Sequence, residues 1–186
     1  YCDKSEFVRY SCGKKADPLE LRIDSANPTK ILGEIQVKGD AVMLGYYKQP
    51  DITADTFTDD GYMRTGDLGV IDKYGNIYIK GRSKNMILTA NGQNIYPEEI
   101  EELLNAMAHV RESIIINRKN RIIAIVATDN DDSNPLSKSQ LETIMKANLV
   151  MLNQKLPAYA QVSDIEILDD DFERTPKNSI KRFMYK

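Results

Sequence analysis

Residues 62–101 contain three short runs, YMRTGDL at 62–68, GRSKN at 81–85 and NGQNIYPEEIE at 91–101. The pattern of apolar residues differs on the two sides of the second run. Before it, apolar and polar residues alternate, as they do in half-buried strands. After it, β-branched strands are mixed with amphipathic helices. The sequence therefore predicts a β-rich region at 1–81, a hinge at 82–84 and a small α+β domain at 85–186.

The β-rich region is expected to contain strands at 19–23, 33–39, 68–72 and 77–80. The last two flank residues 73–76, a hairpin turn in which glycine and asparagine suit positive φ angles. Residues 49–55 read as a turn into a short helix.

The α+β domain is expected to begin with a short strand at 86–88 and a turn at 91–93. Pro97 suits the first position of a helix, and the acidic Glu98, Glu99 and Glu101 are expected to complement the positive end of its dipole. The apolar face of this helix has the spacing i, i+3, i+4 and i+7. Its residues are Ile100, Leu103, Leu104 and Met107.

The rest of the domain is expected to contain strands at 111–116 and 121–128, joined by a turn at 117–120. A second helix follows, with Ser137 and Gln140 as a capping box and Pro157 as its stop. A last strand at 162–168 leads into a charged tail at 169–186.

Composition excludes several classes of protein. A net charge of −3 provides no basic surface for a phosphate backbone, so nucleic acid is not an expected partner. Two cysteines and one histidine are too few for a disulfide framework or a Cys/His metal site, and they fit a cytoplasmic protein. No apolar run approaches the ~20 residues that span a bilayer.

In order and spacing, the three runs at 62–101 resemble the adenylate-forming (AMP-binding) superfamily, which includes acyl-CoA synthetases, peptide-synthetase adenylation domains and luciferases. The Gly/Ser/Thr-rich phosphate loop of that superfamily is not among the 186 residues. The resemblance therefore implies the β-rich end of a large adenylating domain followed by a mobile C-terminal domain. The missing N-terminal part of the same protein is an expected partner, and the chain alone is expected to be inactive.

Within the superfamily the chain resembles long-chain fatty acid–CoA ligases, in GYYKQP at 45–50, DGY at 60–62 and KRF at 181–183. The implied reaction converts a fatty acid and ATP, with Mg²⁺, to acyl-AMP and pyrophosphate, after which the thiol of CoA displaces AMP. Peripheral contact with a membrane is a further expectation for such an enzyme.

Several nucleotide-binding residues follow from the resemblance. A single carboxylate can accept hydrogen bonds from both hydroxyls of a ribose, and Asp67 is expected to do so. Taken alone, Asp67 would read as a turn residue in front of a strand. Tyr62 and Thr65 are expected near the nucleotide, and Arg82 at its ribose or phosphate. Lys84 occupies the position of the family's hinge residue.

Two further segments are expected to reach the active site. Gly92, Gln93 and Asn94 match a loop that helps to form the channel for the pantetheine arm of CoA. The tail sequence ERTPKNSIKR at 173–182 resembles the last motif of the family, in which a lysine serves adenylation. The usual Gly-Lys is absent here.

The identity of that lysine stays open from the sequence. An alignment of residues 179–181 on the family motif favours Lys181. An alignment without gaps places Ser179 there and leaves Lys177 as the nearby cation. A solvated, non-functional tail is the third alternative.

Two other functions are compatible with the sequence. The chain could belong to an amino-acid or aryl-acid adenylation domain that loads a carrier protein, because the residues of the substrate pocket lie outside it. It could also be a non-catalytic binding module that retained the fold.

Overall fold

A computed structural model of the chain describes residues 7–89, 91–129 and 136–186. The chain divides into two compact units, Tyr1–Asn85 and Met86–Lys186. Both units combine sheets with a few helices, which confirms the predicted mixed fold class. None of the helices in the described ranges has the length and apolar character required to cross a bilayer.

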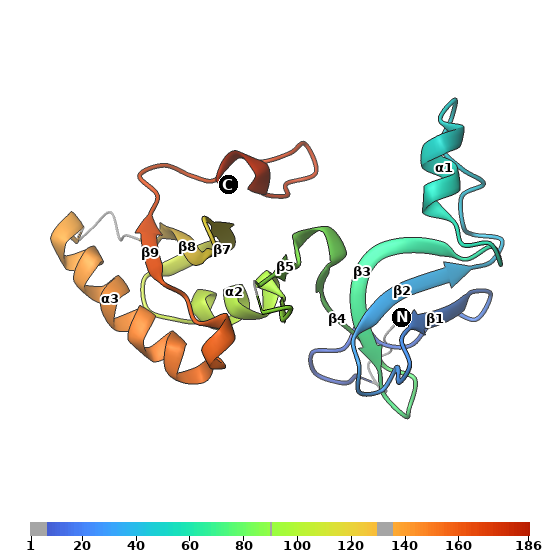
Figure 1. The fold of residues 1–186 in the computed structure, drawn as a ribbon, viewed down its shortest axis with the longest axis horizontal. Helices are drawn as coiled ribbons and strands as arrows, with labels where there is room; N and C mark the ends of the chain where they lie inside the picture. Colours follow the sequence, from blue (N-terminus) through green and yellow to red (C-terminus); the bar gives the residue numbers. More distant parts are fainter. Residues whose placement is uncertain (1–6, 90, 130–135) are drawn as a thin grey trace. The chain divides into compact units, whose positions relative to one another are not determined.

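The first unit is built on a four-stranded antiparallel sheet with strands in sequence order (Figure 1). Its strands are β1 (Glu20–Asp24), β2 (Gly33–Lys38), β3 (Met63–Ile71) and β4 (Ile77–Arg82). The helix α1 (Pro50–Thr56) lies in the connection between β2 and β3, and no residue of α1 is buried. A short 3-10 helix, η2 (Ser83–Asn85), follows β4. The core of this unit is small, with Ile23, Ile35 and Ile77 as its buried cluster.

The second unit contains a three-stranded sheet in the order β7-β8-β9. Strands β7 (Val110–Arg118) and β8 (Arg121–Thr128) form an antiparallel hairpin, and β9 (Asp164–Ile167) pairs parallel to β8. The helix α3 (Lys138–Lys155) and the 3-10 helix η3 (Ala158–Ala160) lie in the crossover to β9. Before this sheet come a small hairpin of β5 (Ile87–Leu88) and β6 (Asn94–Ile95) and the helix α2 (Pro97–Asn105).

Alternation along β7 and β8 divides their apolar residues between two layers. One face packs against α2 and α3 through residues such as Leu104, Ile115 and Leu152. The opposite face carries Ile114, Ile116, Ile123 and Ile125, which pack with residues 168–185 after β9. In Figure 1 the helices lie below the strands and this tail lies above them. The predicted charged tail therefore covers one face of a sheet.

The predicted apolar face of α2 and the predicted capping box of α3 are both confirmed. On α2, Ile100 and Leu104 are buried, while Leu103 and Met107 pack partly buried against the same core. The capping box of α3 is formed: the Ser137 hydroxyl accepts from the backbone N–H of Gln140, and the Gln140 side chain accepts from the Ser137 backbone. This arrangement satisfies two backbone donors at the helix start.

Candidate functional site

The run Thr65-Gly66-Asp67 lies inside β3, as a bulge, and the interpretation of Asp67 as a residue in front of a strand is wrong. On β2, Glu34 pairs with Leu68 and Gln36 with Arg64, so three residues of β3 stand opposite one residue of β2. Gly66 has a φ of +73°, a left-handed conformation that glycine adopts without strain.

Side chains from both strands hold the bulge in shape. The Thr65 hydroxyl donates to the Ile35 carbonyl at 2.8 Å and accepts from the Asp67 N–H at 3.1 Å. The Gly66 N–H donates to the Glu34 carboxylate at 3.1 Å. The sequence analysis missed Glu34, since nothing in the alternating pattern of β2 distinguishes it from an ordinary surface acid.

The bulge places Asp67 beside Arg82. The two residues are register partners on β3 and β4, and Arg82 Nε lies 2.8 Å from Asp67 Oδ1. Their side chains are 26% and 51% exposed, respectively. A partly exposed carboxylate and a guanidinium thus stand together where β4 ends. Such a pair can receive both the hydroxyls and the phosphate of a nucleotide.

Tyr62 belongs to a different cluster. Its hydroxyl donates to Glu20 at 2.7 Å, and the Arg22 guanidinium lies 4.0 Å from its ring centroid. The hydrogen bond to Glu20 raises the pKa of Tyr62 above its ordinary value. The structure therefore brings Thr65, Asp67 and Arg82 together, while Tyr62 is engaged elsewhere and its role at the nucleotide stays a prediction.

Lys84 lies in η2, exposed, one residue before the end of the first unit. An exposed side chain at this place loses no core contact when the backbone rotates. Its role as a hinge stays a prediction.

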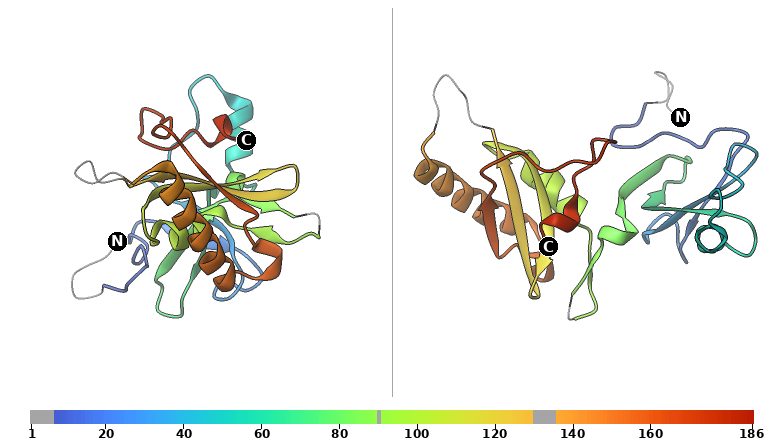
Figure 2. Two further views of the ribbon diagram at one scale, coloured as in Figure 1. Left: turned by 90° about the vertical axis from the view of Figure 1, so that its left-hand side faces the viewer. Right: turned by 90° about the horizontal axis from the view of Figure 1, so that it is seen from above.

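The hairpin of β5 and β6, yellow-green in Figure 2, carries Gly92, Gln93 and Asn94. All three residues are exposed. The Thr89 hydroxyl accepts from the Gln93 N–H at 3.0 Å and donates to the Gln93 carbonyl at 3.1 Å. Gly92 has a φ of +74°, and no atom of the described residues lies within 4 Å of the place that a Cβ would take. Residues 91–94 thus present an open surface that a ligand chain can approach.

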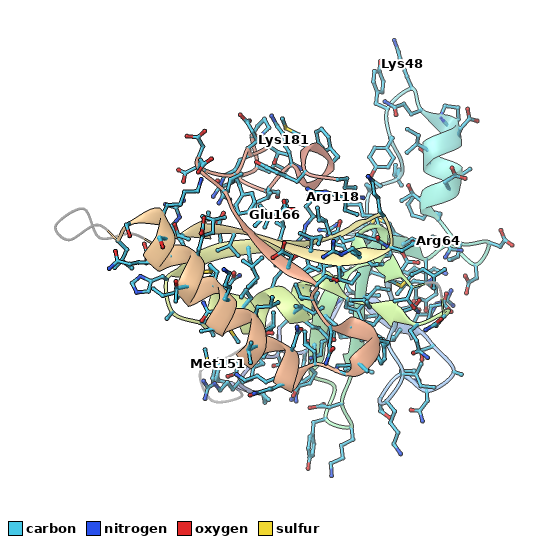
Figure 3. All side chains as sticks on the ribbon, turned by 60° about the vertical axis from the view of Figure 1, so that its left-hand side comes forward. Lys48, Arg64, Arg118, Met151, Glu166 and Lys181 are labelled. Carbon is cyan, nitrogen blue, oxygen red and sulfur yellow. The ribbon has the colours of Figure 1, made fainter. Side chains whose placement is uncertain are left out.

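The tail is anchored to the sheet by aromatic and polar contacts. Tyr185 packs edge-on against Phe172 with ring centroids 5.3 Å apart, and its hydroxyl accepts from the Glu173 N–H at 2.8 Å. Arg118 donates to the Tyr185 carbonyl at 3.1 Å and to Glu166 at 2.6 Å. Figure 3 shows Lys181 on this tail, and Arg118 and Glu166 on the strands beneath it.

The two candidate lysines have different surroundings. Lys181 is 31% exposed, and its Nζ lies 3.5 Å from the Glu173 carboxylate. Lys177 is exposed in the turn between Thr175 and Ser179. Within the described part of the chain, Lys177 forms no ion pair.

Glu101 is buried and lies beyond the first turn of α2, so the expectation that it complements the helix dipole is wrong. Its carboxylate accepts from the Ile115 N–H at 2.6 Å and from both Arg182 Nη atoms, at 2.6 and 2.5 Å. Burial raises the pKa of Glu101, while the hydrogen bonds from Arg182 act in the opposite direction. The sequence carries no signal for this pair, because its members are 81 residues apart.

The family model of the AMP-binding enzyme C-terminal domain matches residues 84–185, more than half of the chain. The chain belongs to the AMP-binding enzyme family. The family predicted from the three runs at 62–101 is thereby confirmed.

Other members of the AMP-binding family are similar to the chain over different lengths. A sulfoacetate–CoA ligase of Cupriavidus necator is 53% identical over 41% of the chain and 15% of the relative. A long-chain-fatty-acid–CoA ligase of Yersinia pestis is 36% identical over 78% of the chain and 26% of the relative. The crystal structure of ATP-bound MatB from Rhodopseudomonas palustris is 29% identical, with a TM-score of 0.78, over 96% of the chain and 35% of MatB.

The chain therefore spans between about a seventh and about a third of the length of these relatives. The roles of Asp67 and Arg82 at the ribose and phosphate of a nucleotide stay predictions. Magnesium is different: the residues that the structure describes contain no group of three Asp, Glu, His or Cys side chains that could hold a metal ion. Mg²⁺ commonly binds through substrate phosphates and one or two carboxylates.

Proposed function

We propose that this chain is part of an ATP-dependent acid–CoA ligase that activates a carboxylic acid as acyl-AMP and transfers the acyl group to CoA. The observation that carries the proposal is the Asp67–Arg82 pair on the β3 bulge of a family member. Asp67 would receive the ribose hydroxyls of the nucleotide, and Arg82 its ribose or phosphate oxygens. Tyr62 and Thr65 would lie at the edge of this site.

In the first step, a carboxylate oxygen of the acid attacks the α-phosphorus of ATP, and pyrophosphate leaves. In the second step, the CoA thiol attacks the acyl carbon and AMP leaves. Activation is required because a carboxylate is a poor electrophile. ATP with Mg²⁺ and CoA are the implied cosubstrates, and the hairpin loop at Gly92, Gln93 and Asn94 would line the path of the pantetheine arm.

The acid is proposed to be a long-chain fatty acid. Support comes from the GYYKQP, DGY and KRF runs and from the similarity to the Yersinia pestis ligase over 78% of the chain. The sulfoacetate–CoA ligase shows that a relative with higher identity over a shorter range acts on a very different acid. A series of acids from acetate to palmitate, assayed with the intact enzyme, decides between these substrate classes.

One tail lysine would stabilise the charge that develops at the α-phosphate during adenylation. Lys181 is paired with Glu173 and would have to exchange that partner for substrate, whereas Lys177 is the more accessible cation. In the intact enzyme, replacing the lysine that has this role with alanine should slow acyl-AMP formation by ~10²-fold or more. Thioester formation from supplied acyl-AMP should remain nearly unchanged. A tail that is only structural would show neither effect for Lys181→Ala or Lys177→Ala.

The region 82–84 is proposed to act as a hinge between a domain at 1–81 and one at 85–186. Lys84→Pro would fix φ at this position and should separate the two half-reactions. Pyrophosphate exchange should survive better than thioester formation if the adenylating arrangement is trapped. Equal loss of both activities in a folded variant would contradict the hinge.

The experiment that tests the proposed site is Asp67→Ala in the intact enzyme. Loss of two charge-assisted hydrogen bonds to ribose should weaken ATP binding by about 2–4 kcal/mol. The exposed acid Asp51 on α1 provides a control, since Asp51→Asn should leave the KM for ATP unchanged. An unchanged KM and kcat in Asp67→Ala would show that Asp67 only shapes the bulge.

The chain alone is expected to produce no acyl-CoA and to bind ATP at most weakly. Asp67 and Arg82 can contact ribose and phosphate edges, but no phosphate loop holds the triphosphate. Isothermal titration that gave submicromolar ATP affinity for these 186 residues would contradict this expectation. Peripheral membrane contact and cytoplasmic location stay predictions.

A further inference from the structure

The tail contains a closed turn that carries Lys177. Arg174 and Ile180 form an isolated antiparallel bridge, and the Thr175 N–H donates to the Ser179 carbonyl at 2.8 Å. Asn178, next to Lys177, has a φ of +62°, which lets the chain reverse direction. The position of Lys177 is therefore determined by how the two arms of this turn are fixed.

An arginine fastens each arm of the turn to another element of the second unit. On the first arm, Arg174 forms an ion pair with Glu112 of β7. On the second arm, Arg182 forms the bidentate pair with Glu101 of α2. The Lys181 N–H also donates to the Glu173 carbonyl at 2.8 Å, which connects the two arms.

The Glu101–Arg182 pair differs from the other tail ion pairs in its burial. The side chains of Glu101 and Arg182 are 8% and 21% exposed, whereas those of Arg111 and Asp171 are 47% and 81% exposed. Exposed pairs contribute little to stability, but removal of one member of a buried pair leaves an uncompensated charge. Because Glu101 also accepts from the Ile115 N–H, one carboxylate joins α2, β7 and the tail.

We infer that Glu101 and Arg182 are positioning residues for adenylation: their pair holds the lysine-bearing turn in one orientation on the sheet. Neither residue is assigned a contact with substrate. The inference rests on the proposed function for its catalytic consequence. Its structural part, fixation of the turn, can be tested separately on this chain.

The structural test measures amide hydrogen exchange of residues 173–182 in the chain of 186 residues. Arg182→Ala and Glu101→Gln should speed exchange at Thr175, Asn178 and Lys181 by about tenfold or more, because the turn opens without unfolding of the unit. Glu101→Gln keeps an oxygen that can accept from the Ile115 N–H, so this variant remains informative if Arg182→Ala fails to fold.

Two variants complete this test. Arg182→Lys retains the charge but loses the fork geometry and should give an intermediate exchange rate. Arg111→Ala removes an exposed pair between the same sheet and tail and should leave the exchange of the turn unchanged. Exchange at the wild-type rate in folded Glu101→Gln and Arg182→Ala would overturn the inference.

The catalytic test uses the intact enzyme. Glu101→Gln and Arg182→Ala should slow acyl-AMP formation by about tenfold or more and change thioester formation from supplied acyl-AMP by less than about twofold. Arg182→Lys should recover part of the adenylation rate. Equal losses in both half-reactions would show a merely structural role and overturn the inference. A wild-type enzyme that forms no acyl-AMP would instead contradict the proposed function, while the exchange measurement would still decide on fixation of the turn.

Discussion

At the scale of single residues, Asp60 shows how surface hydrogen bonds make stability depend on pH. The Arg22 guanidinium donates to both oxygens of Asp60, at 2.5 and 3.0 Å, and the Thr58 hydroxyl donates at 2.6 Å. The hydrogen bond from Arg22, followed by that from Thr58, lowers the pKa of Asp60 to about 2. Because the folded pKa lies below the unfolded value, the bonds stabilise the charged form.

This cluster makes a prediction for acid unfolding of the first unit. The contribution of Asp60 is fully present above its ordinary pKa of 3.8 and is lost as pH falls through the folded value of about 2. Asp60→Asn should therefore reduce the pH dependence of the free energy of unfolding in this window. Urea unfolding at several pH values measures it. An identical pH dependence in both proteins would mean that the pair is not maintained in solution.

At the scale of elements, β3 contains a second glycine, Gly69, which is needed for lack of space, whereas Gly66 is needed for its positive φ. Gly69 stands opposite Gly33, and a Cβ on Gly69 would lie 2.6 Å from the Tyr78 carbonyl oxygen of β4. Backbone atoms cannot yield as a flexible side chain can. Gly69→Ala should therefore destabilise the first unit by about 1–3 kcal/mol, measured as a shift in its thermal transition. An unshifted transition would show that β4 moves away without cost.

The helix α3 is stabilised at its start by the capping box of Ser137 and Gln140. Ser137→Ala removes the acceptor for the Gln140 N–H and should cost the second unit about 1 kcal/mol. Ser137→Asp retains an acceptor and provides the matched control, with stability near that of the wild type. Chemical denaturation followed by circular dichroism gives both values. Equal destabilisation by alanine and aspartate would contradict the capping role.

At the scale of the whole molecule, the two units differ in the size of their cores. In the described ranges, three buried apolar residues form the cluster of the first unit, while the two clusters of the second contain thirteen and six. Buried apolar area is the main source of stability, so the first unit should unfold at the lower temperature. Calorimetry should resolve two transitions, with Gly69→Ala shifting the lower and Ser137→Ala the upper. A single transition shifted by both variants would contradict independent unfolding.

Local signals in the sequence predicted most elements, but pairing over long distances could not be read from it. Turn residues and alternation located the hairpins, and the capping box located α3. Alternation does not reveal what covers each face of a sheet, so the packing of Phe172 and Tyr185 on β7 and β8 was unexpected. For the same reason Glu101 looked like an ordinary acid in the first turns of a helix. The runs at 62–101 predicted the family because each is a short continuous segment that can be recognised without knowing which distant residues it contacts.

The parallel pairing of β9 with β8 has a consequence for the order in which the second unit forms. The β7–β8 hairpin closes through two residues, Lys119 and Asn120, both with positive φ, and can form rapidly. Strand β9 must wait until the segment between Thr128 and Asp164 has folded back, which carries a larger entropic cost. The tail follows β9 in the chain and binds the face that the hairpin presents. A newly made molecule would thus form the hairpin first and the lysine-bearing turn last, so a partly folded intermediate would lack the turn for which we propose a role in adenylation.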